Sequence, residues 1–242
     1  MGTQAVNQPA YYARTGSPGR DLLALLHAPY TRWHLSYVAM GAAIAPQLDW
    51  IHFGGTLLAF LFGMGIGAHA LDEFHDRPLG TTLSRGALLA LAVGGISAGA
   101  ALAVAGALVI SPWVAAWGTA GVLLAIGYAL EVPGWLHTVL GFGLAWGGFP
   151  VLVGYWAQTQ KLSAPAVVLA AFATLISMTQ RFLSTPARFV RRHTDEAGAW
   201  FDLGMQYEHW SQDRLLDTWE RPLILLGWAM TLLAVTLLAL HL

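Results

Sequence analysis

The side chains whose types and spacing could do chemistry gather at residues 69–76, which read HALDEFHD. His69, Asp72, Glu73 and Asp76 are spaced i, i+3, i+4 and i+7, and an α-helix places residues with these spacings on one face. Three carboxylates on one face repel each other unless cations, arginines or protons offset their charge. The pattern predicts a divalent metal site with these four residues as ligands, in which His69, Asp72 and Asp76 are the candidate catalytic residues.

The chemistry of this cluster leaves several alternatives open. Carboxylate oxygens are the ligands that Mg²⁺ prefers, whereas the imidazole of His69 suits Fe, Mn, Cu or Zn better. His69 and Asp72 could also act as acid and base, and a buried, neutral Asp72 or Glu73 could protonate a substrate. In a purely structural alternative, the cluster is the hydrated end of a membrane helix, Arg77 and Arg85 neutralise it, and His69 forms hydrogen bonds between helices.

The element that must position this cluster is a transmembrane helix, because the composition of the chain suits lipid as a solvent. Of the 242 residues, 56% are hydrophobic and only 10% are charged, against about a quarter charged in soluble proteins. About 20 apolar residues cross a hydrocarbon core of roughly 30 Å. This rule predicts an all-α polytopic membrane bundle of about seven transmembrane helices, at residues 33–48, 52–71, 84–110, 112–130, 133–156, 164–183 and 222–242. The cluster lies where the second helix leaves the membrane.

The placement of charge predicts how the bundle is oriented, because Lys and Arg concentrate in short cytoplasmic loops. Arginines precede the first helix and lie in the second–third and sixth–seventh loops, whereas the opposite loops carry little charge beyond Asp49 and Lys161. We therefore expect an integral membrane protein with a cytoplasmic N-terminus and an external C-terminus. The segments are a cytoplasmic stretch with a short interfacial helix (1–30), a six-helix transmembrane core (31–187), a cytoplasmic amphipathic cap over the mouth of the bundle (188–220) and a final transmembrane helix (221–242).

The composition also excludes several classes of site and partner. The chain has no cysteine, so disulfides, thiolate metal sites and cysteine nucleophiles are excluded. The arginines form no basic stripe with interleaved aromatic residues, so we expect no nucleic-acid partner. The first 30 residues contain no apolar core followed by a small-residue cleavage site, so we expect no removable signal peptide. Glycine- and alanine-rich third and fourth helices leave a homo-oligomer open.

The cluster resembles the first acidic motif of the UbiA superfamily of intramembrane prenyltransferases, Asp-x-x-Asp-x-x-x-Asp at the cytoplasmic end of helix 2. This chain reads His69-x-x-Asp72-x-x-x-Asp76, so the spacing matches and a histidine replaces the first acid. Three further segments resemble the family: Arg32-Trp-His34-Leu, Arg77-Pro-Leu with Thr81, Thr82 and Arg85, and GFGLAWGGFPVLVGYWAQTQ at residues 141–160. The resemblance covers residues 30 to about 185.

The resemblance implies transfer of a prenyl group from an isoprenyl diphosphate, with the diphosphate neutralised by Mg²⁺ held on carboxylates. The candidate substrate-binding residues are Arg32, Arg77, Gln180, Arg181, Ser184, Arg188 and Arg192. Two features depart from the family. Its members carry a second acidic motif after helix 6, where residues 180–192 of this chain are basic, and they have nine spans where seven are predicted here.

Three functions follow as hypotheses. The first is a UbiA-like enzyme that acts on an isoprenoid or other lipid substrate by metal-dependent prenyl transfer. The second is the same scaffold with a transition-metal or acid/base site, as a terpene cyclase or a lipid- or quinone-modifying enzyme. The third is a non-enzymatic membrane assembly factor or lipid carrier, in which the polar groups hold helices together.

Overall fold

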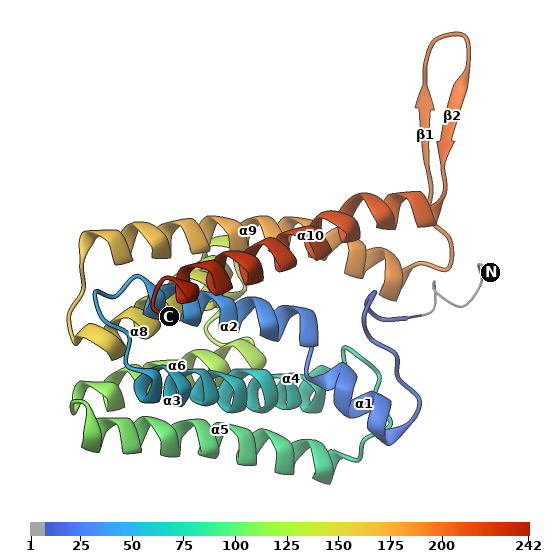
Figure 1. Ribbon diagram of the computed structural model, residues 1–242. Coiled ribbons are helices and arrows are strands. Elements are labelled where there is room, and N and C mark those ends of the chain that lie inside the picture. Colours follow the sequence, from blue (N-terminus) through green and yellow to red (C-terminus); the bar gives the residue numbers. More distant parts are fainter. Residues whose placement is uncertain (1–7) are drawn as a thin grey trace.

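The computed structural model describes residues 8–242 as a bundle of helices that lie side by side, with one β-hairpin leaving the bundle at one end (Figure 1). The elements in order are α1 (Pro18–Leu25), α2 (Ala28–Ala43), α3 (Trp50–Phe60), η1 (Leu61–Ala68), α4 (His69–Asp76), α5 (Arg85–Val109), α6 (Trp113–Ala129), η2 (Gly134–His137), α7 (Val139–Gly143), η3 (Leu144–Gly148), α8 (Phe149–Thr159), α9 (Ala164–His193), β1 (Ala199–Asp202), β2 (Tyr207–Trp210) and α10 (Gln212–Ala239). We call the end where α4 and α9 finish and α5 begins the arginine-rich end.

Five helices in the described part are long and apolar enough to cross a membrane: Trp50–Asp76, Arg85–Val109, Val139–Thr159, Ala164–His193 and Gln212–Ala239. The first joins α3, η1 and α4 without a break, and the third joins α7, η3 and α8. Two further helices of the bundle are shorter, since α2 has 16 residues and α6 has 17. The structure therefore supports a helical membrane bundle, and the count of seven spans stays a prediction.

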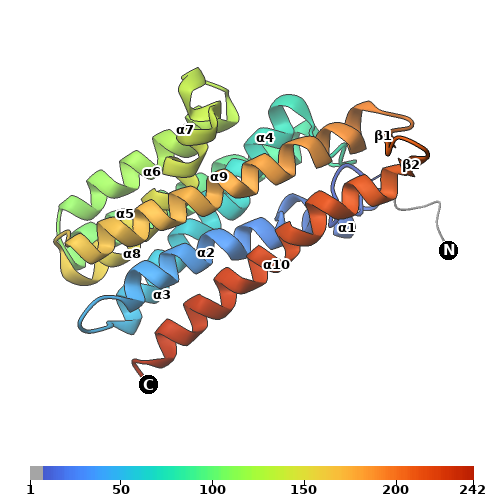
Figure 2. The ribbon, with the colours of Figure 1, turned by 90° about the horizontal axis from the view of Figure 1, so that it is seen from above.

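The first predicted span begins earlier than expected and forms the centre of the bundle. Helix α2 starts at Ala28 and packs against α8 and α10, and Figure 2 shows it between its neighbours. Its buried side chains include Trp33, Tyr37 and Met40. The α2–α8 contact is a close backbone crossing, because a Cβ atom added at Gly154 would collide with the carbonyl oxygen of Val38. Only glycine allows this approach.

The segment 188–220 differs from the expected amphipathic cap. Residues 188–193 continue α9, residues 199–210 form the hairpin, and α10 already begins at Gln212. The aromatic residues of this segment favour strands, and Gly204 takes a positive φ of 88° at the turn. The hairpin points away from the bundle (Figure 1). The mouth is instead covered by residues 9–13, since the Arg192 Nε atom donates a hydrogen bond of 3.2 Å to the Pro9 carbonyl.

Helix α1, at Pro18–Leu25, is the short helix expected within residues 1–30, before the first span. It is fastened to the α4–α5 loop by the buried carboxylate of Asp21. That carboxylate accepts hydrogen bonds from the Thr82 backbone N–H (2.7 Å), the Thr82 hydroxyl (2.5 Å) and the Gly16 N–H (2.9 Å). The three hydrogen bonds outweigh the effect of burial and lower the pKa of Asp21.

Candidate functional site

The helix that carries the cluster changes its winding just before the cluster begins. Residues Leu61–Ala68 form a π-helical stretch that contains Gly63, Gly65 and Gly67, and α4 follows at His69. This stretch lies directly on α5, because a Cβ atom added at Gly67 would be 2.7 Å from the Ile96 nitrogen. π-Helical turns inside α-helices are frequent at functional sites, because they change the direction in which the following side chains point.

The four predicted metal ligands do not share one environment. Asp72 is half-buried and interacts electrostatically with Arg192 and Arg188 of α9. Asp76 is exposed and lies 3.8 Å from His75. Among the described residues, no three His, Cys, Asp or Glu side chains gather closely enough to hold a metal ion. The metal site therefore stays a prediction from the sequence.

Glu73 has a structural role in this arrangement. Its side chain is 0% exposed, and its two carboxylate oxygens accept hydrogen bonds from the backbone N–H groups of Leu79 and Thr81, both at 2.8 Å. Arg77 closes the same loop from the other side by donating to the Thr81 carbonyl (2.9 Å) and the Leu83 carbonyl (3.1 Å). Both residues are therefore occupied in shaping the α4–α5 loop.

His69 belongs to a group of aromatic and imidazole rings at the mouth that sequence analysis did not identify. Its Nδ1 atom lies 3.1 Å from the Gly65 carbonyl oxygen, and its ring centroid is 4.3 Å from that of His27. The hydroxyl of Tyr12 lies 2.6 Å from His27 Nδ1. Burial, then the neighbouring His69, Arg192 and Arg188, hold the pKa of His27 well below its usual value, so this ring is neutral.

No spacing in the sequence signals this ring group. His27 and Tyr12 lie 42 and 57 positions before His69, and only folding of the N-terminal segment over the bundle brings them together. The available signal was compositional, namely Tyr11, Tyr12 and Tyr30 in the same N-terminal segment as a histidine.

Three of the predicted substrate-binding arginines lie near Asp72. Arg181 donates hydrogen bonds to the Tyr128 hydroxyl (3.0 Å) and the His137 carbonyl (2.6 Å). The Tyr128 hydroxyl interacts electrostatically with Arg181, Arg188 and Asp72, so these side chains lie in the region around this hydroxyl. Arg192 is close enough to interact with Asp72 and with the Tyr12 hydroxyl. The basic segment at the end of α9 therefore faces the acidic end of α4.

The remaining predicted substrate-binding residues make other contacts. The Arg32 guanidinium lies 3.7 Å from the centre of the Trp228 ring, on the α10 side of α2. Ser184 is buried and donates a long hydrogen bond of 3.4 Å to the Arg181 carbonyl. Gln180 is buried as well, and within the described residues its Oε1 atom has no hydrogen-bond partner.

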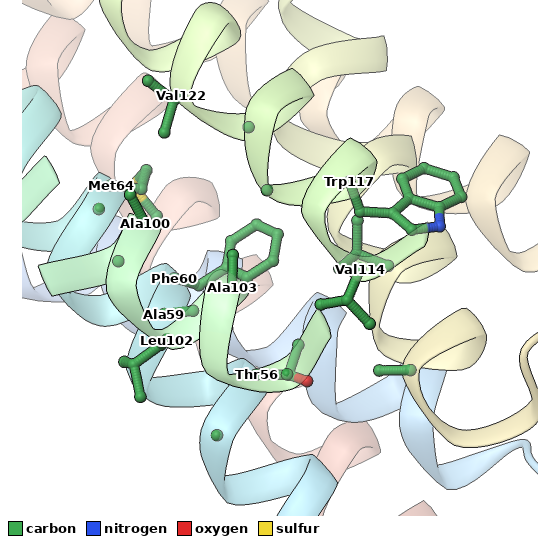
Figure 3. Close-up of a pocket in the computed structure, with 18 of the residues that line it drawn as sticks. Thr56, Ala59, Phe60, Met64, Ala100, Leu102, Ala103, Val114, Trp117 and Val122 are labelled. Carbon is green, nitrogen blue, oxygen red and sulfur yellow. The ribbon is translucent and has the colours of Figure 1, made fainter. Parts of the chain in front are cut away.

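An apolar cavity of about 270 Å³ opens within the membrane-spanning part, between the helix Trp50–Asp76 and helices α5, α6 and α8. Figure 3 shows Phe60, Met64 and Trp117 among the side chains that line it. Trp146 of η3 also lines this cavity. The Trp146 ring lies 5.8 Å from the His34 ring and 5.2 Å from the Tyr128 ring, both measured between centroids. This tryptophan separates the apolar cavity from the charged site.

Comparisons with models of protein families, with curated proteins and with solved structures find no match to this chain.

Proposed function

We propose that this protein is a UbiA-like integral membrane enzyme that binds an isoprenoid with an anionic head group and transfers the prenyl chain from its diphosphate. The observation that carries the proposal is the position of Trp146, which contacts the apolar cavity on one side and the ring of Tyr128 beside Arg181 on the other. An amphipathic substrate needs a polar and an apolar compartment that adjoin one another.

The arginines argue for an anionic head group. Arg188 and Arg192 interact electrostatically with Asp72, and Arg181 and Arg188 interact with the Tyr128 hydroxyl. Guanidinium groups bind phosphate oxygens through paired hydrogen bonds that fix both position and charge. The site therefore suits a diphosphate, with Asp72 orienting the arginines or a substrate hydroxyl.

The reaction proposed for this site breaks the bond between the first prenyl carbon and the ester oxygen that joins it to the diphosphate. The bond electrons leave with the diphosphate, and the arginines stabilise the charge that develops there. The allylic carbon then bonds to a nucleophilic atom of an acceptor, whose proton passes to a base at the mouth or to water. The apolar lining around Trp146 and Met64 keeps water from the cation in the meantime.

We place the arginine-rich end on the cytoplasmic side. The proposal rests on the positive-inside rule, since Arg77, Arg85, Arg188 and Arg192 lie at this end and Lys161 lies at the other. A soluble isoprenyl diphosphate in the cytoplasm would then enter head group last, with its chain between the helices.

A second function is favoured by the rings beside Asp72. The Tyr12 hydroxyl is hydrogen-bonded to His27, and the His27 ring packs against that of His69, so these groups could move a proton to or from a neutral lipid or quinone. This alternative uses the same cavity and differs in requiring no diphosphate.

The two functions are separated by binding measurements on the full chain in lipid nanodiscs. The probes are geranylgeranyl diphosphate, geranylgeraniol and inorganic diphosphate, each with Mg²⁺ and with EDTA. We expect the prenyl diphosphate to bind more tightly than the alcohol in both buffers. Equal affinity for the diphosphate and the alcohol would refute the prenyl-transfer proposal and favour proton chemistry on a neutral substrate. Binding that is abolished by EDTA would show that a metal, and not the arginines alone, holds the head group.

Matched variants locate the two compartments. Arg188→Gln and Arg192→Gln should each weaken diphosphate binding by about 10- to 100-fold, because a hydrogen bond to a charged group contributes ~1.5–3 kcal/mol. Arg221→Gln is the control, since Arg221 is exposed and pairs with Asp217. Trp146→Ala should weaken binding of geranylgeranyl diphosphate and leave binding of inorganic diphosphate unchanged. A loss of both would place Trp146 in the head-group site instead.

A further inference from the structure

The hairpin formed by β1 and β2 exposes more apolar surface than a free element in water should. Met205 at its tip is 101% exposed, Trp200 and Tyr207 are both 71% exposed, and Leu203 is 55% exposed. A two-stranded hairpin alone is marginally stable in water, and its own ring contacts, Trp200 with His209 and Phe201 with Trp210, cover only part of it. Large exposed apolar patches on a protein mark interaction sites.

The charge of this region argues against the bilayer as its partner. Residues 195–213 contain five acids and no Lys or Arg: Asp195, Glu196, Asp202, Glu208 and Asp213. Only Glu208 has an ion-pair partner among the described residues, the Arg214 guanidinium at 2.6 Å. Anionic lipids attract basic segments and repel acidic ones. The partner of the hairpin should therefore present cations beside an apolar surface.

Such a surface exists on the opposite edge of the same molecule. Arg14, Arg20 and Arg85 are exposed around α1 and the start of α5, and none has an ion-pair partner within residues 8–242. Leu22 and Leu23 of α1 are 44% and 68% exposed beside them. We call these five residues the α1 edge. It offers the positive charge that the hairpin lacks, together with exposed apolar side chains.

The hairpin and the α1 edge lie on opposite sides of the same end of the bundle. In Figure 1 the hairpin leaves the bundle on the side of α9 and α10 and runs across the direction of the helices, whereas α1 and the start of α5 lie on the opposite side. Figure 2 places the hairpin and α1 at the same end of the bundle. Because helices of neighbouring copies in one membrane share a common direction, the hairpin of one copy points at the α1 edge of the next. At 3.3 Å per residue it reaches roughly 20 Å.

We propose that the hairpin of one copy docks on the α1 edge of a second copy, so that chains associate head to tail in the plane of the membrane. The acids of the hairpin lie against Arg14, Arg20 and Arg85, and its tip covers Leu22 and Leu23. A contact between two different patches is heterologous, so a pair of copies still has one free hairpin and one free α1 edge. The contact builds rows or rings larger than a dimer. This inference does not depend on the proposed function.

The absence of cysteine from the chain makes cross-linking a direct test. Met205→Cys marks the tip of the hairpin, and Gly19→Cys marks the α1 edge, since a Cβ atom at Gly19 meets no atom within 4 Å. The double variant, oxidised in native membranes, should give a ladder of dimers, trimers and higher species. A variant with Met205→Cys and Lys161→Cys is the control, because Lys161 lies at the other end of the bundle and should give no ladder.

Charge exchange tests the chemistry of the contact. Arg20→Glu with Arg85→Glu should abolish the ladder, and adding Asp202→Arg with Asp195→Arg should restore it. Any of three results would overturn the proposal. The first is the absence of a ladder from the folded double-cysteine variant, and the second is a dimer from Met205→Cys alone, which would mean that two hairpins meet. The third is quenching of hairpin tryptophan fluorescence by brominated lipids, which would place the hairpin in the bilayer.

Discussion

Replacement of Glu73 by glutamine should destabilise the protein, although it changes only one atom. Both carboxylate oxygens accept backbone N–H groups at 2.8 Å, and the side chain is completely buried. The amide NH₂ of glutamine would face the N–H of either Leu79 or Thr81, so one buried donor would lose its acceptor. That loss costs ~1–3 kcal/mol, and the remaining hydrogen bond loses the strength that a charged acceptor gave it. We expect a total of about 3 kcal/mol.

The assay is thermal unfolding of the purified chain in detergent. For a chain of this length about 3 kcal/mol corresponds to a fall in Tm of roughly 6–12 °C. Asp76→Asn is the matched control, because Asp76 is exposed and should change stability by less than about 0.5 kcal/mol. It should also leave prenyl diphosphate binding unchanged.

The result also separates a loop-stabilising role for Glu73 from the metal site expected from the sequence. If Glu73→Gln unfolds like the wild type and Asp76→Asn abolishes Mg²⁺-dependent binding, the two carboxylates hold a metal together and the structural assignment of Glu73 is wrong. A large fall in Tm for Glu73→Gln, with normal binding by Asp76→Asn, confirms the loop-closing role.

Three further outcomes follow from the structure. The folded pKa of Asp21 is lowered, so its carboxylate stabilises the fold above its unfolded pKa. This stabilisation is lost as the pH falls through the folded pKa, so the Tm difference between wild type and Asp21→Asn should shrink in acid. The folded pKa of His27 lies well below its unfolded value of 6.5, so NMR should show its ring titrating at lower pH than a free histidine, and stability should fall as the pH drops below 6.5. Gly154→Ala should cost ~1–3 kcal/mol by forcing α2 and α8 apart, whereas Gly94→Ala, where a Cβ atom meets nothing within 4 Å, should be neutral or stabilising in the same unfolding assay.

The helical character of the chain could be predicted because apolar length alone specifies it. Segments 52–71 and 164–183 each lie inside one of the five long apolar helices, and segment 84–110 exceeds the helix Arg85–Val109 by one residue at each end. The ends of these helices were harder to predict. Helix α9, for example, continues past the predicted end at residue 183 to His193, through polar residues that also favour helix. The hairpin was missed because its strands of four residues are shorter than any reliable alternation pattern.

The candidate site could be predicted only in outline. Spacing placed His69, Asp72, Glu73 and Asp76 on one helical face, and it treated the three acids as equivalent. Their environments differ because the α4–α5 loop folds back over Glu73 alone, which depends on backbone N–H groups that no side-chain pattern reports. The basic stretch at the end of α9 was correctly identified as unlike an acidic motif, and the structure places it near Asp72.

The π-helical stretch Leu61–Ala68 makes the site tolerant of one particular deletion. A π turn accommodates one residue more than an α turn, so removing one residue from this stretch would restore a regular α-helix. His69 and Asp72 would then stay on about the same face of the helix. A residue removed from a regular α-helical part just before His69 would instead rotate every later side chain by about 100° about the helix axis. In a set of homologous sequences, one-residue gaps within 61–68 should therefore be compatible with an unchanged site, whereas gaps in the flanking α-helical turns should not.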